Sequence, residues 1–159
     1  MARLLMVDHE KCTGCRTCEI VCSMGHVGAI NPSRSRIIAI KDMTEGKGIP
    51  IVCTQCQSAP CEAICPVNAI SRSDIGTVAI DYDRCIGCRI CVAVCPFGAI
   101  AFDTIGGIVT KCDLCDGDPL CVRFCVYGAL EYAEAADATM MKRRRAADKL
   151  SAATAKVPD

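Results

Sequence analysis

The sequence contains no tryptophan, only three Phe and three Tyr, and no long run of apolar residues. Hydrophobic packing of large side chains is therefore expected to be thin, and something else must hold the chain together. No segment approaches the about 20 apolar residues that a transmembrane helix needs. The N-terminal apolar run, Leu4 to Val7, is too short for a signal-peptide core, and no twin-arginine pair accompanies it. We therefore expect a cytoplasmic protein with no membrane span.

The residues that substrate chemistry would need are also missing. There is no "GxGxxG" dinucleotide loop, the carboxylates are scattered, and the two histidines, His9 and His26, stand alone. We therefore predict no catalytic residues, no cofactor-binding residues other than metal ligands, and no enzymatic activity of the chain by itself. The formal net charge is zero, and no basic patch is interleaved with aromatic residues, so no nucleic-acid partner is expected.

Cysteine is the residue that the sequence has in excess. Sixteen cysteines form four groups with none left over. The groups are I (Cys12, Cys15, Cys18, Cys22), II (Cys53, Cys56, Cys61, Cys65), III (Cys85, Cys88, Cys91, Cys95) and IV (Cys112, Cys115, Cys121, Cys125). Three closely spaced cysteines on one loop can reach three corners of a cubane cluster. The spacing therefore favours iron–sulfur clusters over structural zinc, which prefers separated cysteine pairs, and over disulfides.

The repeat extends beyond the cysteines. Segments with a glycine turn and strand-forming flanks lie between the groups, at Ser35–Cys53, Ser71–Asp83 and Ala101–Thr110, and each is typical of a β-hairpin. Each group ends in a four-residue step, which places its last two cysteines on one face of a short helix. We therefore predict an α+β fold of repeated ferredoxin-like units with short hairpins and short helices around the clusters.

Two arrangements of the groups are open. Consecutive pairing joins I with II and III with IV, whereas nested pairing places an inner unit (II and III) within an outer one (I and IV). Proline follows the fourth cysteine of groups II and III, at Pro66 and Pro96, but Ser23 and Val126 take its place in groups I and IV. If groups that share this detail are partners, the pattern favours nesting.

Four segments carry a family resemblance: "DHEKCTGCRTCEIVC", "CTQCQSAPCEAICPVNAI", "DYDRCIGCRICVAVCPFGAI" and "TKCDLCDGDPLCVRFCVYGAL". They resemble the motifs of four-cluster ferredoxin-like electron-transfer subunits, which serve molybdenum and tungsten oxidoreductases and some hydrogenases and carbon monoxide dehydrogenases. The resemblance covers about residues 3–132. It implies four [4Fe–4S] clusters. In two-cluster ferredoxins the fourth cysteine of a motif ligates the other cluster.

The ligand sets implied by this resemblance exchange the fourth cysteine between partner groups. They are Cys12, Cys15, Cys18 with Cys125; Cys112, Cys115, Cys121 with Cys22; Cys53, Cys56, Cys61 with Cys95; and Cys85, Cys88, Cys91 with Cys65. We accordingly predict a four-cluster domain over residues 1–132 and a helical tail over residues 133–159.

The function implied is electron transfer between a catalytic subunit and an external acceptor, such as a ferredoxin or a flavin subunit. Among known complexes the chain is most similar to the small subunit of tungsten aldehyde oxidoreductase. Formate dehydrogenase, hydrogenase, carbon monoxide dehydrogenase and benzoyl-CoA reductase stay open as partners. A free polyferredoxin and a zinc-binding interaction module are alternatives of other classes.

The tail raises a separate question. Residues 133–155 are rich in alanine, which favours a helix, and "KRRR" lies at 142–145. It is either a solvated helix or a docking element, in which Met140, Met141 and Arg143 to Arg145 contact a catalytic subunit. Two assemblies are open: a heteromeric complex with one copy per catalytic subunit, and head-to-tail self-stacking.

Overall fold

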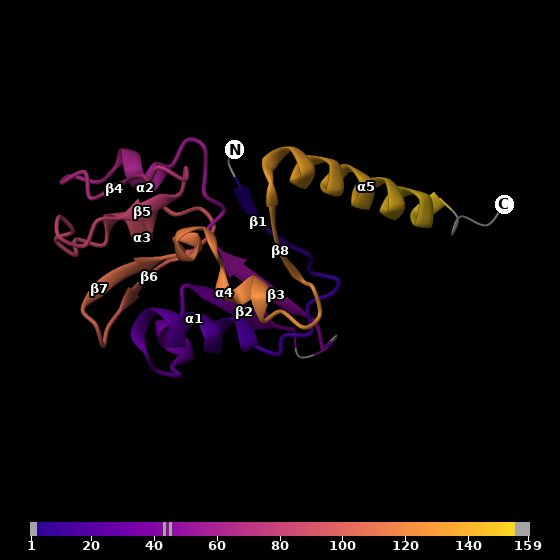
Figure 1. Cartoon of the computed structure of the whole chain (residues 1–159), viewed down its shortest axis with the longest axis horizontal. Helices are drawn as coiled ribbons and strands as arrows, with labels where there is room; N and C mark the ends of the chain where they lie inside the picture. The colour runs from indigo at the N-terminus through magenta and orange to yellow at the C-terminus, as the bar shows by residue number, and fades with distance from the viewer. Residues whose placement is uncertain (1–2, 43, 45, 155–159) are drawn as a thin grey trace.

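A computed structural model describes residues 3–42, 44 and 46–154 (Figure 1). Within them the strands form four two-stranded antiparallel sheets, which pair β1 with β8, β2 with β3, β4 with β5 and β6 with β7. The strands are β1 (Arg3–Val7), β2 (Ile37–Lys41), β3 (Gly48–Val52), β4 (Ile70–Arg72), β5 (Val78–Ile80), β6 (Ile100–Asp103), β7 (Ile108–Lys111) and β8 (Leu130–Glu134). The last three sheets are the hairpins predicted from the sequence.

Short helices follow the cysteine loops, as predicted. The helical segments are α1 (Thr17–Val27), η1 (Pro32–Arg34), α2 (Pro60–Ala63), α3 (Ile90–Val94), η2 (Leu114–Gly117), α4 (Leu120–Arg123) and α5 (Ala135–Thr154). The α+β fold class and its helical tail are thus confirmed, with residues 155–159 of the predicted tail lying outside the described residues. None of the helices in the described ranges has the length and apolar character needed to cross a bilayer.

The two ends of the cysteine-bearing region meet in one sheet. β1 and β8 pair in a register that places Leu5 opposite Tyr132, although most of the chain separates them. The helices that carry groups I and IV, α1 and α4, pack together, and so do α2 and α3, which carry groups II and III. In Figure 1 the α2, α3, β4 and β5 elements accordingly lie together on one side, and α5 extends away on the other.

Two small apolar clusters make up the core, and cysteines belong to both. One contains Cys22, Cys112 and Cys121 beside Ile37, Val52, Leu114 and Leu130. The other contains Cys61 and Cys91 beside Ala59, Ile70, Val78, Ile100 and Val109. Few large side chains are buried among the described residues, and cysteines therefore make up much of both clusters.

An ion pair connects the two halves of the fold, that is, the part that carries groups I and IV and the part that carries groups II and III. The Arg34 guanidinium Nε donates to Asp103 Oδ2 at 2.7 Å, and Asp103 Oδ1 accepts from the backbone N–H groups of Ile105 and Gly106, each at 3.0 Å. The N–H of Gly106 and then Arg34 lower the pKa of this buried carboxyl group below its ordinary value. Asp103 is therefore ionised at neutral pH and ties β6 to the segment after α1.

We expect Arg34→Gln and Asp103→Asn each to destabilise the protein, and the double variant to lose less than the sum. Residues in direct contact show coupling energies of about 0.5–3 kcal/mol, and Asp103 is buried with several donors aimed at it. Denaturant unfolding of the four proteins at pH 7 measures the coupling. Strict additivity would show that this pair does not stabilise the contact between the halves.

Candidate metal centres

The sixteen cysteines gather at four places, each combining three cysteines of one group with one of another. Three places are pockets that open to solvent, with about 340 to 360 Å³ of space not filled by protein atoms. We call them site A (Cys12, Cys15, Cys18, Cys125), site C (Cys53, Cys56, Cys61, Cys95) and site D (Cys65, Cys85, Cys88, Cys91). The structure thus brings together the three corresponding sets that the resemblance implied.

The remaining cysteines form site B (Cys22, Cys112, Cys115, Cys121). Cys22, Cys112 and Cys121 are buried in one apolar cluster. Burial, followed by the charges of Asp113 and Cys22, raises the pKa of Cys115. Cys22 is therefore placed with group IV, as in the implied set.

A left-handed backbone residue turns each cysteine loop. The residue before the second cysteine has a positive φ in every group: 65° at Gly14, 52° at Gln55, 68° at Gly87 and 59° at Leu114. Glycine adopts this conformation readily, whereas the residue types of the buried Gln55 and Leu114 give no signal for it. A non-glycine residue in this conformation costs about 1–3 kcal/mol, so the loops fit a group that holds the sulfurs convergent.

The fourth cysteine of every group accepts a backbone N–H at its sulfur. In groups II, III and IV the donor is an alanine four residues on: Ala69 to Cys65 at 3.2 Å, Ala99 to Cys95 at 3.4 Å and Ala129 to Cys125 at 3.2 Å. In group I it is Arg36, at 3.3 Å from Cys22 Sγ. The repeated alanine was a signal in the sequence that the interpretation above missed. Such hydrogen bonds favour the thiolate and tune a bound cluster.

The residues that replace proline in groups I and IV, Ser23 and Val126, lie in different structural contexts. After Cys22, α1 continues to Val27, and the buried Ser23 hydroxyl donates to the Ile20 carbonyl at 3.0 Å and accepts from Asn31 N–H at 3.1 Å. A proline inside this helix would break it. After Cys125 the chain makes the same turn as after Cys95, with Val126 exposed in place of Pro96. Proline usage therefore does not mark groups I and IV as structurally alike.

Polar side chains adjoin site B. His26 Nε2 lies 3.7 Å from Cys115 Sγ and 3.5 Å from Asp113 Oδ1, and Arg36 pairs with the same Asp113 carboxylate. Burial, followed by the charge of Arg36, lowers the pKa of His26. His26 is therefore neutral at pH 7 and forms part of the surroundings of the site. His26 stands apart from any motif in the sequence, so the sequence gave no sign of its contact with Cys115.

Two apolar clusters connect the four sites. Cys18 of site A and Cys53 of site C both pack against the apolar cluster that holds the site B cysteines. Cys61 of site C and Cys91 of site D share the second apolar cluster. Sites A and C thus each adjoin the cluster of site B, and sites C and D share a cluster, which supports the order A, B, C, D.

The donor chemistry of the sites fits iron–sulfur clusters. Burial is the main cause that raises the pKa of Cys18 and Cys112 to about 12, with neighbouring negative groups adding to it. Four thiolates in such surroundings need a compensating positive charge, which an iron–sulfur core supplies. Cysteine-only sites with three ligands on one short loop and a fourth from elsewhere match [4Fe–4S] coordination.

Comparisons with known proteins agree with this chemistry. A protein-family model described as "4Fe-4S dicluster domain" matches residues 44–135, and a second family model with the same description matches residues 11–70. Electron transport protein HydN of Escherichia coli (strain K12) is 41% identical over 96 residues, which are 56% of this chain and 53% of that protein.

A second relative is the aliphatic sulfonate oxidoreductase, polyferredoxin-like subunit, of Pyrococcus furiosus, 39% identical over 85 residues, or 53% of this chain and 49% of that one. The aligned part thus spans about half the length of these curated relatives. A chain of the active site complex BamBC of benzoyl coenzyme A reductase with 1,5-dienoyl-CoA superposes with a TM-score of 0.50 and 31% identity, covering 83% of this chain and 75% of that one.

Proposed function

This chain belongs to the family of 4Fe-4S dicluster domain proteins, and from that premise we propose that it is the electron-transfer subunit of an oxidoreductase complex. We propose that sites A to D each hold one [4Fe–4S] cluster through the four cysteines named above. Sites A and B then form an outer unit from groups I and IV, and sites C and D an inner unit from groups II and III.

What supports this proposal is the gathering of the cysteines in all-cysteine sets, neighbours of which share an apolar cluster. A [4Fe–4S] cluster, when bound, takes up and returns one electron. The chain fixes the spacing, because α1 carries ligands of both A and B, and one helical turn advances about 5.4 Å. The N–H groups of Arg36, Ala69, Ala99 and Ala129 hold one sulfur of each site in place. Every cysteine has a place in this scheme, so none is left as a nucleophile.

We propose a molybdenum or tungsten enzyme as the catalytic partner, with a tungsten aldehyde oxidoreductase as the first choice. The polyferredoxin-like relative is named as a subunit of an oxidoreductase, which supports a partner of this kind. Benzoyl-CoA reductase is the second candidate, because the BamBC chain matches over most of this chain's length. Formate dehydrogenase, hydrogenase and carbon monoxide dehydrogenase, with a flavin subunit or ferredoxin as the external acceptor, are further alternatives.

We propose α5 as the element that docks this partner. Its extensive contacts are with β1 and β8, and it projects from the body of the fold (Figure 1). Met140 is half exposed, and Arg143 and Arg144 are exposed, so an apolar and a basic contact are both offered. The side chains of Lys142 and Arg145, also in the predicted docking segment, lie outside the described residues.

Purification of the tagged chain from its native host is expected to recover an untagged large subunit that contains molybdenum or tungsten. A variant that lacks residues 136–159 should keep four clusters, by iron and sulfide analysis, but recover at least tenfold less of that subunit. Metal analysis and mass spectrometry of the eluates measure both results. Recovery of the chain alone would favour a free polyferredoxin, and zinc in place of iron would favour the interaction module.

The same eluate tests the assembly. Particle masses over a concentration series give one fixed value for a complex with one copy per catalytic subunit. Masses that grow with concentration would instead indicate head-to-tail stacking of this chain.

A further inference from the structure

A lysine is buried in the middle of the row of sites. Lys111 ends β7 directly before Cys112 of site B, and it is 1% exposed. Its Nζ donates to the backbone carbonyl oxygen of Val78 and, at 3.3 Å, to that of Cys112. Its position is therefore fixed by two carbonyl groups at the junction between sites B and C.

No carboxylate of the described residues pairs with this lysine. Over the ranges that the structure describes, no carboxylate lies within ion-pair distance of Nζ. A buried charge without a partner is costly, and a lysine ammonium has three protons to donate but only two carbonyl acceptors here. The negative charge that compensates Lys111 must then come from the adjacent cysteine sites in their loaded state.

Lys111 faces site C. Lys111 lines the cavity of this site together with the four cysteines and, among the described residues, is the one charged residue in that lining. Burial raises the pKa of the site C ligand Cys61, and the charge of Lys111 opposes that increase. Sites A and D have Arg16 and Arg89 in their linings, but both arginine side chains are exposed, and water screens their charges.

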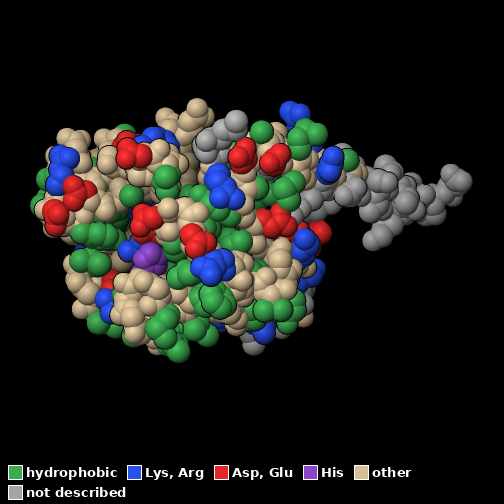
Figure 2. All heavy atoms as spheres, in the orientation of Figure 1, with side chains coloured by type: hydrophobic (Ala, Val, Ile, Leu, Met, Phe, Trp, Pro, Cys, Tyr) green, Lys and Arg blue, Asp and Glu red, His purple; other side chains and the backbone are tan. Residues whose placement is uncertain are grey.

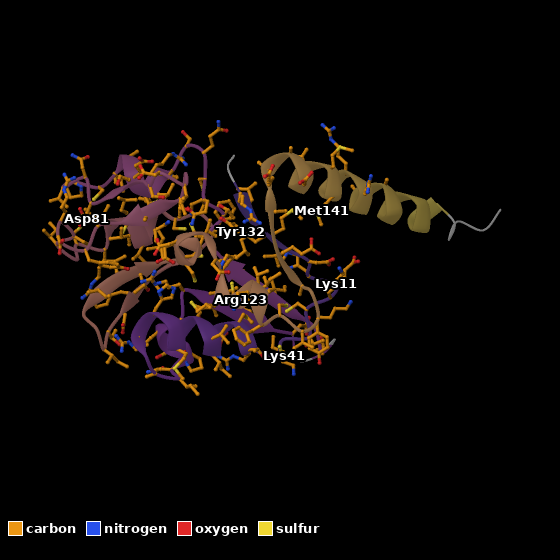
Figure 3. All side chains as sticks on the ribbon, in the orientation of Figure 1. Lys11, Lys41, Asp81, Arg123, Tyr132 and Met141 are labelled. Atoms are coloured by element: carbon orange, nitrogen blue, oxygen red, sulfur yellow. The ribbon has the colours of Figure 1, made fainter. Side chains whose placement is uncertain are left out.

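Lys11 gives an internal comparison, because it precedes the first cysteine of group I as Lys111 precedes that of group IV. Its side chain is 49% exposed and pairs with Asp8 at 3.8 Å and Glu131 at 3.7 Å. Figure 3 shows Lys11 at the edge of the molecule, on the side of α5. The same sequence feature thus places one lysine in solvent and the other between two sites.

We propose that Lys111 sets the reduction potential of site C, raising it above those of sites A and D, so that an electron in the row resides first in its interior. The inference rests on the proposed function in requiring loaded clusters. Reduction adds one negative charge to the site, and a fixed positive charge in a poorly screened interior stabilises that charge more than an exposed one does. Lys111 thereby acts on the cluster without being one of its ligands.

The test compares Lys111→Met, which keeps the length of the side chain but removes the charge, with Lys111→Arg and Lys11→Met. Each loaded protein is titrated with mediators under EPR detection. We expect Lys111→Met to lower the reduction equilibrium constant of one cluster at least tenfold, or about 59 mV for a one-electron couple. Lys11→Met should change every constant less than twofold, and Lys111→Arg should stay closer to wild type than Lys111→Met.

An unchanged or raised potential in a fully loaded Lys111→Met protein would overturn the proposal. A second measurement uses variants of the cysteine ligands, so it does not depend on whether Lys111→Met binds its clusters. Cys56→Ser is expected to alter the signal that appears first on reduction, whereas Cys15→Ser and Cys88→Ser are expected to alter later signals. A change of the first signal by Cys15→Ser or Cys88→Ser would also overturn it. Iron and sulfide content is measured in parallel. The proposed function itself would be contradicted only if the wild-type protein contained no iron and sulfide.

Discussion

Cys125→Ala and Cys15→Ala are expected to remove the same cluster, although the two cysteines lie at opposite ends of the fourfold repeat. Both line site A, so either change leaves that site with three thiolates. Iron should fall from about sixteen to about twelve atoms per chain in each variant, because one four-iron cluster is lost. EPR spectra of the reduced proteins would then lack the same signal.

Cys115→Ala is the matched control, since it belongs to the same group as Cys125 but to site B. It should remove a different signal. Loss of one common signal in Cys115→Ala and Cys125→Ala would instead mean that group IV keeps its own fourth cysteine. Loss of one common signal in Cys125→Ala and Cys88→Ala would mean that groups III and IV are paired consecutively.

Glu19→Ala is expected to have the largest effect on stability among changes that leave all the cysteines in place. Glu19 is 1% exposed on α1, between Cys18 of site A and Cys22 of site B. Its Oε1 accepts from Ala39 N–H of β2 at 2.7 Å, and its Oε2 accepts from Arg16 Nε at 2.8 Å. Removing the carboxylate leaves a buried backbone donor unpaired, which costs about 1–3 kcal/mol, and adds a cavity.

Glu19→Gln keeps an acceptor for Ala39 N–H and should be destabilised less. Arg16→Ala should be milder still, because the Arg16 side chain is 56% exposed and Glu19 keeps its backbone donor. Denaturant-induced loss of the visible cluster absorption measures the order. An equal loss in Glu19→Gln and Glu19→Ala would show that the charge of Glu19, rather than its hydrogen bond to β2, stabilises the helix.

The repeat made much of the fold predictable from local sequence. The glycine turns and strand-forming flanks specify the three hairpins, and the equal four-residue steps specify the short helices. The pairing of β1 with β8 carried no local signal, because it depends on where groups I and IV meet in space. Cluster chemistry was readable because cysteine spacing reflects the geometry of the ligand.

The surroundings of the sites were less predictable. Lys11 and Lys111 occupy equivalent sequence positions, yet one is half exposed and the other buried, because only tertiary packing places β7 beside β5. Gln55 adopts its left-handed conformation while its side chain hydrogen bonds to Cys112 and Val78, far away in the sequence. Ser23 and Val126 both replace proline in the sequence, yet Ser23 lies in a continuing helix and Val126 in a turn.

Charge on the molecular surface also follows tertiary structure rather than sequence runs. On the face seen in Figure 2, acidic and basic side chains are interspersed with hydrophobic ones and form no extended patch of one sign. Asp113 and Asp118, close together in the acidic loop of group IV, are paired with Arg36 and Arg123. The loop is therefore less negative than its sequence suggests.

The row of four sites with exchanged fourth cysteines is the central claim, and the positions of iron test it most directly. An iron-loaded crystal with anomalous diffraction at the iron edge should show four separate peaks in the order A, B, C, D. Cys22 should lie at the same peak as Cys112, and Cys125 at the same peak as Cys12. Cys22 bound at the peak of Cys12 or of Cys53, or peaks that do not follow this order, would contradict the account.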